Sequence, residues 1–404
     1  LRNRPDLAAR LADFALARGI ETDFVRLLIE RNALPAPVDA GPAWPFRLRI
    51  RALGGFALVR DGQPMRFSGK AQQRPLDLLK AVVAQGGAGI DSAAVTAALW
   101  PDADGAAAKA SFDAALFRLR KLLDVDGAVQ LTGGKLSLAP ALVWTDVRAL
   151  EAFGARGGGS AAEAEAAEYL RDRLIEIGLA ARVEEFELPN GATSRNVIAC
   201  VAGSDDAVLV LGGHLDTKPP SPGANDNASG CAALLEIAAI LAEDPVVPTV
   251  EFVFFGSEEI IGGNPNDHHF GSRYRVSRMS TAERDATAGM ISVDMIGYGP
   301  DFHSRTMNRG PQMLSDMLLA RARDLGIPMT YRRDPGSSGW SDHEAYELAG
   351  VPVSWIEWRD DPVYHTAGDT SGHLSTSKIA TAGTLVLEFA RGLDEEDLAA
   401  LLAR

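Results

Sequence analysis

The sequence predicts an α/β protein in its second half, with a mostly parallel sheet flanked by helices, and a smaller α+β unit before it. Three observations lead to this prediction. After residue 160, short apolar runs of strand length alternate with helical patterns. Such alternation is typical of a parallel sheet that is covered by helices on both faces. Residues 46–67 instead show a period of two, as in an antiparallel sheet, and three helical patterns follow them.

The chain has 404 residues, of which 46% are hydrophobic, enough for two or three domains with cores of their own. No apolar run approaches the length needed to cross a membrane, and the first residues, LRNRPDLAAR, contain no apolar signal-peptide core. We therefore expect a cytoplasmic protein with no membrane partner. Cys200 and Cys231 lie in apolar contexts that suit buried thiols better than a disulfide framework.

Charge and histidine are unevenly distributed along the chain. Residues 1–156 carry 21 Lys and Arg against 16 Asp and Glu, a net charge of about +5, whereas the remainder has a net charge of about −19. All seven histidines lie after residue 213. Metal or acid–base chemistry is therefore expected in the second half, and the two halves are expected to have different partners.

Residues 1–45 are predicted to form a helical remnant followed by a proline-rich linker. Helical patterns cover 6–18 and 21–32, and the segment LPAPVDAGPAWPF then contains four prolines, which disrupt regular structure. From residue 46 onward, the runs FRLRIR, FALVR and QPMRF predict strands, with Asp61 and Gly62 forming a hairpin turn.

Three helices are predicted next, over 74–85, 91–100 and 106–123, with Asp91 as the N-cap of the second. The run VQLTGGKLSL then predicts a hairpin that turns at its two glycines. A small sheet, three helices and a terminal hairpin make a winged-helix domain, here over 46–153, whose third helix would enter the major groove of DNA. The basic residues of that helix fit an ordinary solvated face equally well, because a net charge of about +5 is weak for a DNA-binding protein.

Residues from about 48 to 151 resemble the OmpR-like winged-helix region of bacterial transcriptional activators. The motifs that carry the resemblance are GKAQQRPLDLLKAVVAQGG, ALWPD, FRLRKLL and VWTDVRALEAF. The resemblance implies that duplex DNA is a partner of this region. It implies contacts from the third helix and candidate phosphate contacts around it, through Arg118, Arg120, Lys121, Lys109 and Lys135.

Residues 154–160 contain three consecutive glycines and a serine, the composition of a flexible linker, and a further domain is predicted over 161–404. Four of the apolar strands predicted in this domain are each followed by an imidazole or a carboxylate. Because the carboxyl ends of parallel strands meet at one edge of a sheet, these side chains should converge. They are His214, Asp216, Glu258, Glu259, Asp294 and His365.

Asp226 precedes an Ala- and Leu-rich helical pattern over 228–242, so its carboxylate should lie near a helix N-terminus. Taken alone, Asp226 is more readily a helix cap and His214 a core histidine. Together with the groups after the other strands, they predict a site for divalent metal ions of the zinc type, in which Asp226 bridges two ions. Two such ions polarise a carbonyl and activate a water molecule, and a neighbouring free carboxylate accepts its proton.

Six motifs in the second half resemble peptidase family M28, the co-catalytic zinc peptidases best known as aminopeptidases, over residues 161–393. In chain order they are GGHLDT, PGANDNASG, FFGSEE, VDMIG, SDHEAYELAGVP and YHTAGDT. The resemblance implies an exopeptidase that acts on a peptide or small aminoacyl substrate. It also implies two Zn²⁺ ions as cofactors, with Mn²⁺ or Co²⁺ as alternatives.

The resemblance implies a role for each matched residue. The implied ligands are His214 and Asp294 on one ion, Glu259 and His365 on the other, and Asp226 between the two. Glu258 would be the general base, and Asp216 would orient His214. Tyr364 would hydrogen-bond the oxyanion of the tetrahedral intermediate.

The sequence departs from the family after the acidic pair, where IIGGNPNDHHFGS replaces a shorter connection to Gly-Ser. His268 and His269 lie in this insertion and are expected to face solvent rather than to bind a further metal ion. His343 is expected near the substrate or in a structural role. His303 and His373 match no motif.

Two alternatives to an aminopeptidase remain open. One is a transcriptional regulator whose peptidase-like half senses a ligand or mediates dimerisation. The other is a relative with different chemistry, a carboxypeptidase or a glutaminyl cyclase. A complete ligand set argues against the regulator, because a decayed site typically loses a ligand. Retention of His214 and of both glutamates argues against a cyclase with one metal ion.

Overall fold

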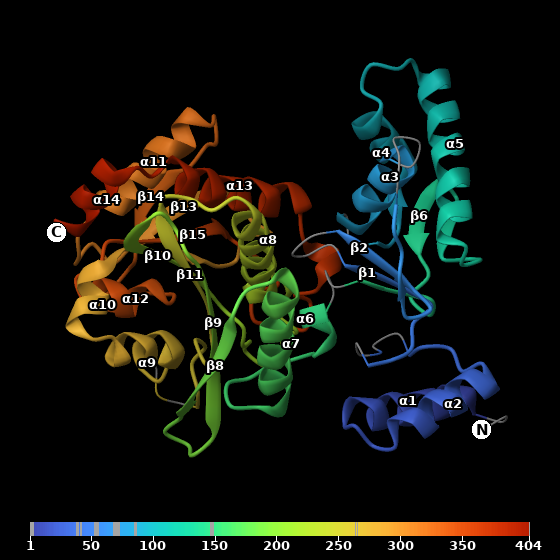
Figure 1. The fold of residues 1–404 in the computed structure, drawn as a ribbon, viewed down its shortest axis with the longest axis horizontal. Coiled ribbons are helices and arrows are strands. Elements are labelled where there is room, and N and C mark those ends of the chain that lie inside the picture. Colours follow the sequence, from blue (N-terminus) through green and yellow to red (C-terminus); the bar gives the residue numbers. More distant parts are fainter. Residues whose placement is uncertain are drawn as a thin grey trace. The chain divides into compact units, whose positions relative to one another are not determined.

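The structure, a computed structural model, describes residues 4–37, 40, 43–51, 56–67, 73–84, 87–145, 149–262, 264 and 266–403. These residues form two compact units, which divide between Ala152 and Phe153 (Figure 1). Parts of two predicted elements lie outside the described residues: 38–39 and 41–42 in the proline-rich segment, and the end of the helix expected over 74–85.

The first unit begins with two helices, α1 (Pro5–Ala17) and α2 (Thr22–Asn32), followed by a four-stranded sheet of order β3-β2-β1-β7. The strands are β1 (Leu48–Arg51), β2 (Ala57–Arg60), β3 (Gln63–Pro64) and β7 (Val143–Thr145). β1, β2 and β3 are antiparallel neighbours, and the pairing of Arg60 with Gln63 places the turn at Asp61 and Gly62, as predicted.

Three further helices and a hairpin of the first unit share one hydrophobic core with the sheet. The further elements are α3 (Gln73–Ala84), β4 (Ile90–Asp91), α4 (Ser92–Leu99), α5 (Gly105–Leu123), β5 (Val129–Thr132), β6 (Lys135–Leu138) and α6 (Ala149–Ala152). Asp91 caps α4 as predicted, because its carboxylate accepts hydrogen bonds from two backbone N–H groups of the first turn. Leu48, Val82, Phe112 and Leu136 are buried together in the core.

The second unit is built around an eight-stranded mixed sheet of order β14-β13-β15-β12-β10-β11-β9-β8. Its strands are β8 (Ala181–Glu187), β9 (Thr193–Val201), β10 (Asp205–His214), β11 (Pro248–Phe255), β12 (Thr287–Val293), β13 (Asp301–Thr306), β14 (Thr330–Arg333) and β15 (Val353–Arg359). The central strands β15, β12, β10 and β11 are parallel. The expectation of a mostly parallel sheet thus holds at the centre, whereas β9 and β13 pair antiparallel with the strands at its two sides.

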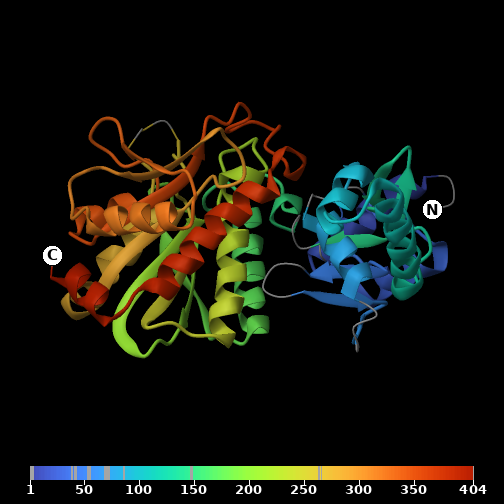
Figure 2. The same cartoon turned by 90° about the horizontal axis from the view of Figure 1, so that it is seen from above.

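Helices cover both faces of this sheet. They are α7 (Ala161–Ile177), α8 (Ser229–Glu243), α9 (Phe270–Arg278), α10 (Thr281–Ala286), α11 (Met313–Asp324), α12 (His343–Leu348), α13 (Thr376–Gly392) and α14 (Glu395–Leu402). α8 packs against α7 and α13, and α11 packs against α13. These four helices form one layer (Figure 2). α9 and α12 pack against each other elsewhere on the sheet. No helix in the described part of the chain is both long and apolar enough to span a membrane.

Residues 154–160 are packed into the second unit, although their composition predicts a flexible linker. The Arg156 side chain is fully buried and donates hydrogen bonds to the carbonyl oxygens of Leu215 and Pro222, at 2.8 and 2.7 Å. A Cβ atom on Gly158 would lie 2.3 Å from the Ser257 hydroxyl. The glycines therefore permit close packing, and Ser160 caps α7 by accepting a hydrogen bond from the backbone N–H of Glu163.

We expect Arg156→Ala to lower the free energy of unfolding of the second unit by about 3 kcal/mol or more. Each buried carbonyl that loses its donor costs about 1–3 kcal/mol. Denaturant titration followed by tryptophan fluorescence measures the change. Arg171→Ala on α7 is the matched control, because Arg171 makes only exposed ion pairs, worth about 1 kcal/mol or less. Equal stabilities of the two variants would show that residues 154–160 are not part of the core.

Candidate metal centre

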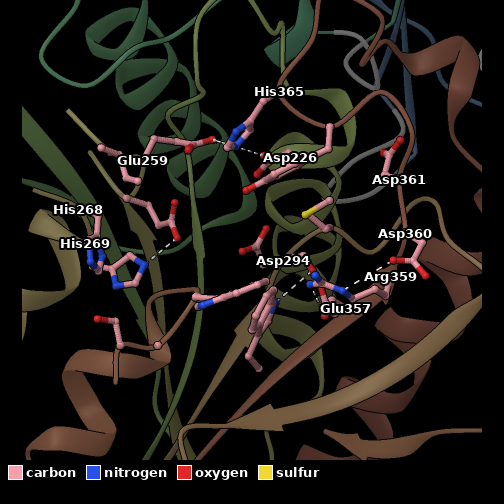
Figure 3. Close-up of a pocket in the computed structure, with 18 residues that line it drawn as sticks. Asp226, Glu259, His268, His269, Asp294, Glu357, Arg359, Asp360, Asp361 and His365 are labelled. Atoms are coloured by element: carbon pink, nitrogen blue, oxygen red, sulfur yellow. Dashed lines mark hydrogen bonds and ion pairs between the residues drawn. The ribbon is translucent and has the colours of Figure 1, made fainter. Parts of the chain in front are cut away.

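The parallel strands of the second unit bring their carboxyl ends to one edge of the sheet. His214 is the last residue of β10, the pair Glu258 and Glu259 follows β11, and Asp294 follows β12. His365 lies in the loop after β15. A short turn, Ala224–Ala228, in which Asp226 has a non-helical backbone conformation, leads directly into α8. The structure therefore brings all five predicted metal ligands together. Four of them, Asp226, Glu259, Asp294 and His365, are labelled in Figure 3.

Asp226 lies between two imidazoles. Its Oδ1 atom is 3.1 Å from Nε2 of His214, and its Oδ2 atom is 3.1 Å from Nε2 of His365. Each imidazole also faces a second carboxylate: His214 lies 3.3 Å from Asp294, and His365 lies 2.9 Å from Glu259. The arrangement is thus two ligand groups that share one carboxylate.

The ligand atoms leave bonding capacity that a cation would fill. Glu259 Oε1, Asp294 Oδ1 and His365 Nε2 are buried atoms that lie at ion-pair distance from an opposite group. Among the described residues, however, none of them finds a partner with good hydrogen-bond geometry. Leaving buried polar atoms unpaired is costly, so such atoms point to a missing partner. Imidazole nitrogens and carboxylate oxygens are the ligands that zinc takes in catalytic sites. The residues present therefore fit divalent metal ions.

The electrostatics of the site also require positive charge. Burial raises the pKa of Glu259 to about 8 and that of Asp294 to about 6. Burial alone would lower the pKa of His365, but its contacts with Asp226 and Glu259 outweigh burial and raise that pKa to about 10. Burial would raise the pKa of Asp226, but the hydrogen bonds from both imidazoles lower it. The buried carboxylates thus favour positive charge beside them, which metal ions would supply.

Asp216 supports the site differently from the expectation. Its carboxylate accepts hydrogen bonds from the backbone N–H groups of Glu258 and Glu259, at 2.9 and 3.2 Å. The partner of His214 Nδ1 is instead the backbone carbonyl of Asp216, at 3.2 Å, while the nearer carboxylate oxygen is 3.5 Å away. Asp216 therefore orients His214 mainly through its main chain and fixes the acidic pair through its side chain.

Asp369 is a supporting residue that the sequence reasoning did not single out, although it lies in the quoted motif YHTAGDT. Its carboxylate accepts hydrogen bonds from the backbone N–H groups of Asn225 and Asp226, at 2.7 and 3.2 Å. Asn225 in turn accepts a hydrogen bond from the N–H of Gly297, at 2.8 Å. These contacts tie the turn that carries Asp226 to the loops after β12 and β15.

The expectation that His268 and His269 face solvent is wrong. Both side chains are buried, and Nε2 of His269 lies 3.0 Å from Oε1 of Glu258 (Figure 3). The polar sequence around them suggested an exposed loop, but the backbone N–H of His269 bonds to the carbonyl of Glu258, which draws the end of the insertion inward.

The remaining histidines have structural partners. His343 is buried, bonds to Asp334 at 2.8 Å and stacks on Trp355, which fits the structural role among those expected. His303 contacts Thr330, and His373 contacts Asp361.

A cleft of about 500 Å³ opens beside the metal centre. Its further lining combines apolar and charged groups: Ile260, Met295, Trp340, Trp355, Glu357, Arg359, Asp360 and Asp361. Tyr364 also lines this cleft; it is 47% exposed and stacks on His365 with ring centroids 3.6 Å apart. Its ring therefore lies at the cleft, beside a metal ligand.

The basic residues predicted to contact DNA all lie on the surface of the first unit. Arg118 and Lys121 are exposed on α5, and Lys135 is exposed at the start of β6. Arg120 donates a hydrogen bond to the carbonyl of Val129, at 3.0 Å, and Lys109 pairs with Asp113 on its own helix.

Comparison with known proteins identifies the second unit. Residues 196–390 match peptidase family M28. The uncharacterized protein YfbL of Escherichia coli is 30% identical over 252 residues, which cover 53% of this chain and 75% of YfbL. The chain belongs to peptidase family M28. The leupeptin-inactivating enzyme 1 of Streptomyces exfoliatus is 31% identical over 215 residues, 51% of this chain and 46% of that enzyme. The chain spans about half the length of the first curated relatives it matches.

Solved structures share the fold of this M28 chain. A zinc aminopeptidase from Bacillus subtilis aligns with a TM-score of 0.55 and 18% identity, over 60% of this chain and 92% of the other. A glutaminyl cyclase from Bacteroides thetaiotaomicron aligns with a TM-score of 0.55 and 21% identity, over 61% of this chain and 96% of the other. Because proteins with both reactions share the fold, the fold alone does not select the reaction.

Removal of metal should destabilise the second unit and leave the first unchanged. The M28 centre gathers buried carboxylates that repel one another unless a cation neutralises them. One ion bound at 100 times its Kd adds about 2.7 kcal/mol to the free energy of unfolding. Calorimetric melting with EDTA and with excess zinc measures the effect, with the transition of the first unit as internal control. Identical melting of the second unit in both conditions would contradict a metal centre.

Proposed function

We propose that the M28 unit is a dinuclear zinc-dependent exopeptidase, an aminopeptidase that hydrolyses N-terminal peptide bonds. The observation that carries the proposal is Asp226, whose two oxygens each face a different imidazole at 3.1 Å. Each imidazole is accompanied by one more carboxylate. A shared carboxylate between two equivalent ligand groups is the arrangement that co-catalytic metal sites use.

The two groups would divide the ligands as the family resemblance implies. His214 and Asp294 would hold one ion, His365 and Glu259 the other, and Asp226 both. When bound, two such ions would polarise the scissile carbonyl and lower the pKa of a water molecule. The chain supplies the remaining steps: Glu258, which is not needed as a ligand in this scheme, accepts the water's proton and delivers it to the leaving amine.

Two further groups of the chain act on the substrate. The Tyr364 side chain, at the cleft beside His365, would donate its hydroxyl hydrogen to the developing oxyanion. Asp360 and Asp361 add negative charge to the cleft lining, against the single arginine Arg359. An acidic cleft favours the protonated amino terminus of a peptide over a terminal carboxylate, which supports an aminopeptidase over a carboxypeptidase.

The alternative reaction is that of a glutaminyl cyclase, because a protein with this activity shares the fold. The presence of His214 and of both glutamates favours a hydrolase with two ions. A panel of aminoacyl chromogenic substrates, beside an N-terminal glutaminyl peptide tested for ring closure, separates the two reactions. Ring closure without hydrolysis would overturn the proposal.

The adjacent glutamates should respond differently to the same substitution. Glu258→Gln should keep two zinc ions per chain and lose about 10²-fold or more in turnover, because the amide cannot accept the water's proton. Glu259→Gln should lower metal occupancy, because an amide is a poorer ligand than a carboxylate. Elemental analysis gives the zinc content, and turnover is measured with metal in excess.

The assignment of the two glutamates fails if Glu258→Gln loses zinc while Glu259→Gln keeps two ions. The proposal of a hydrolase fails if neither substitution lowers turnover. Glu396→Gln, at an exposed position of α14 and well after the last candidate ligand in the chain, is the control that should retain both metal and turnover.

For the first unit we propose a winged-helix fold that binds duplex DNA weakly through α5. The proposal is supported by the order of its elements, a sheet, three helices and the hairpin of β5 and β6, and by the exposure of Arg118 and Lys121 on one helix. The regulator alternative, in which the M28 unit only senses a ligand, requires this binding together with an inactive metal centre.

Arg118→Ala combined with Lys121→Ala should weaken DNA binding by the full chain and reduce its salt dependence. Each lost phosphate contact lowers the slope of log affinity against log salt by about 0.9. Fluorescence anisotropy with a labelled duplex at several salt concentrations measures the slope. Arg10→Ala is the control, because Arg10 is exposed on α1 and lies outside residues 46–153. A slope unchanged in the double variant would remove α5 from this role.

A further inference from the structure

The insertion after the acidic pair returns to the site at His269. The backbone N–H of His269 donates to the carbonyl of Glu258 at 2.8 Å, and the N–H of Phe270 donates to the carbonyl of Ser257 at 2.9 Å. The two ends of the insertion are thereby joined beside the end of β11. His269 is consequently placed next to Glu258 by main-chain contacts, whatever its side chain does.

The side chain of His269 then contacts the carboxylate of Glu258 directly. Nε2 of the ring lies 3.0 Å from Oε1, and both groups are more than nine-tenths buried. A carboxylate oxygen of Glu258 also lies within 4.8 Å of ligand atoms of His214 and Asp294. Glu258 therefore reaches the metal centre while one of its oxygens faces the His269 ring.

The opposite side of the His269 ring is also confined. Its Nδ1 atom is 3.6 Å from Oε2 of Glu344. Glu344 is itself fixed, because it accepts hydrogen bonds from Arg273 at 2.7 Å and from the backbone N–H of Gly339 at 2.6 Å. The rings of His268 and His269 pack edge to face, with centroids 4.0 Å apart. A ring with neighbours on both nitrogen sides and a second ring packed against it has little freedom to turn.

We propose that His269 is a positioning residue for Glu258: its Nε2–H group donates to one carboxylate oxygen and holds the other toward the metal centre. The proposal rests on the function proposed above, in which Glu258 is the general base. A glutamate has three rotatable side-chain bonds, and a base must lie within hydrogen-bond reach of the proton it accepts. Fixing the carboxylate through one oxygen therefore preserves the geometry of proton transfer.

A third metal ion on the same residues is the competing explanation, because His268, His269 and Glu344 also offer ligand atoms within 4.8 Å of one another. The guanidinium of Arg273 argues against it. Arg273 bonds to Glu344 and approaches Nε2 of His268 to 3.5 Å, so a cation already occupies this side of the cluster. A metal count distinguishes the two explanations.

Two amide substitutions at His269 test the proposal, because glutamine places an N–H group near the position of Nε2 and asparagine places one only near Nδ1. We expect His269→Asn to lower kcat by about 10- to 100-fold, the range found for groups that support a metal site from outside it. KM should change by less than about threefold, and the zinc content should match that of the unaltered protein. His269→Gln should recover most of the lost kcat.

The backbone makes this comparison stringent. His269 has a positive φ of 56°, a conformation that asparagine adopts more readily than glutamine. A defect in folding would therefore affect His269→Gln more, the reverse of the expected order in kcat. The same two substitutions at His303, which contacts Thr330 and does not line the cleft, are the matched controls and should retain kcat.

Three results would overturn the proposal. The first is a kcat for His269→Asn within twofold of that of the unaltered protein, and the second is equal losses in the asparagine and glutamine variants. The third is a zinc content that falls from three ions to two in both, which would make His269 a ligand. Absence of turnover in the unaltered, zinc-loaded protein would instead refute the proposed peptidase, so the two failures are distinguishable.

Discussion

The structure of the second unit depends on one carboxylate that two histidines share. Asp226 can face both imidazoles only if His214, at the end of β10, and His365, in the loop after β15, lie on opposite sides of it. The parallel order of β15, β12, β10 and β11 meets this requirement, because it brings their carboxyl ends to one edge. Asp369 then fixes the turn that carries Asp226 by accepting two of its backbone N–H groups. The sheet sets the distance between the elements that carry the two histidines, and the buried contacts of the loops set the direction of the Asp226 carboxylate.

Several buried carboxylates lie around Asp226. Most of them have a hydrogen-bond donor or a basic side chain as a partner. Asp216 bonds to the main chain of the acidic pair, Glu258 faces an imidazole, and Glu344 faces an arginine. Burying charge without such partners costs several kcal/mol per group. Ser341 donates a hydrogen bond to one oxygen of Asp294, whereas the other oxygen, Oδ1, and Oε1 of Glu259 make no hydrogen bond with the described residues. These two oxygens face the candidate metal positions and provide ligand capacity there.

The candidate ligands could be predicted from the sequence because each follows a recognisable strand or precedes a recognisable helix. His214 and Asp294 are examples, since His214 is the last residue of the apolar strand β10 and Asp294 directly follows the apolar strand β12. The burial of His269 could not be predicted, because it arises from backbone hydrogen bonds that join distant ends of a polar segment. Residues 154–160 were misleading for a related reason. Glycine-rich segments occur both as flexible linkers and where two parts of a chain pack closely. In this segment, the buried side chain of Arg156 identifies close packing.

The hydrogen bonds that join the ends of the insertion also determine where the length of this loop can vary. Backbone hydrogen bonds at Ser257 and Glu258 close the segment before His269 as a hairpin stem closes its loop. The entropic cost of lengthening a closed loop grows only as the logarithm of its length, about 0.6 kcal/mol for each doubling. Residues can therefore be added or removed beyond the stem while the acidic pair keeps its place. Because His268 and Ile260 line the cleft, the same additions would reshape its rim. A change of length in this loop would therefore alter the cleft rim while leaving the main-chain hydrogen bonds of the stem in place.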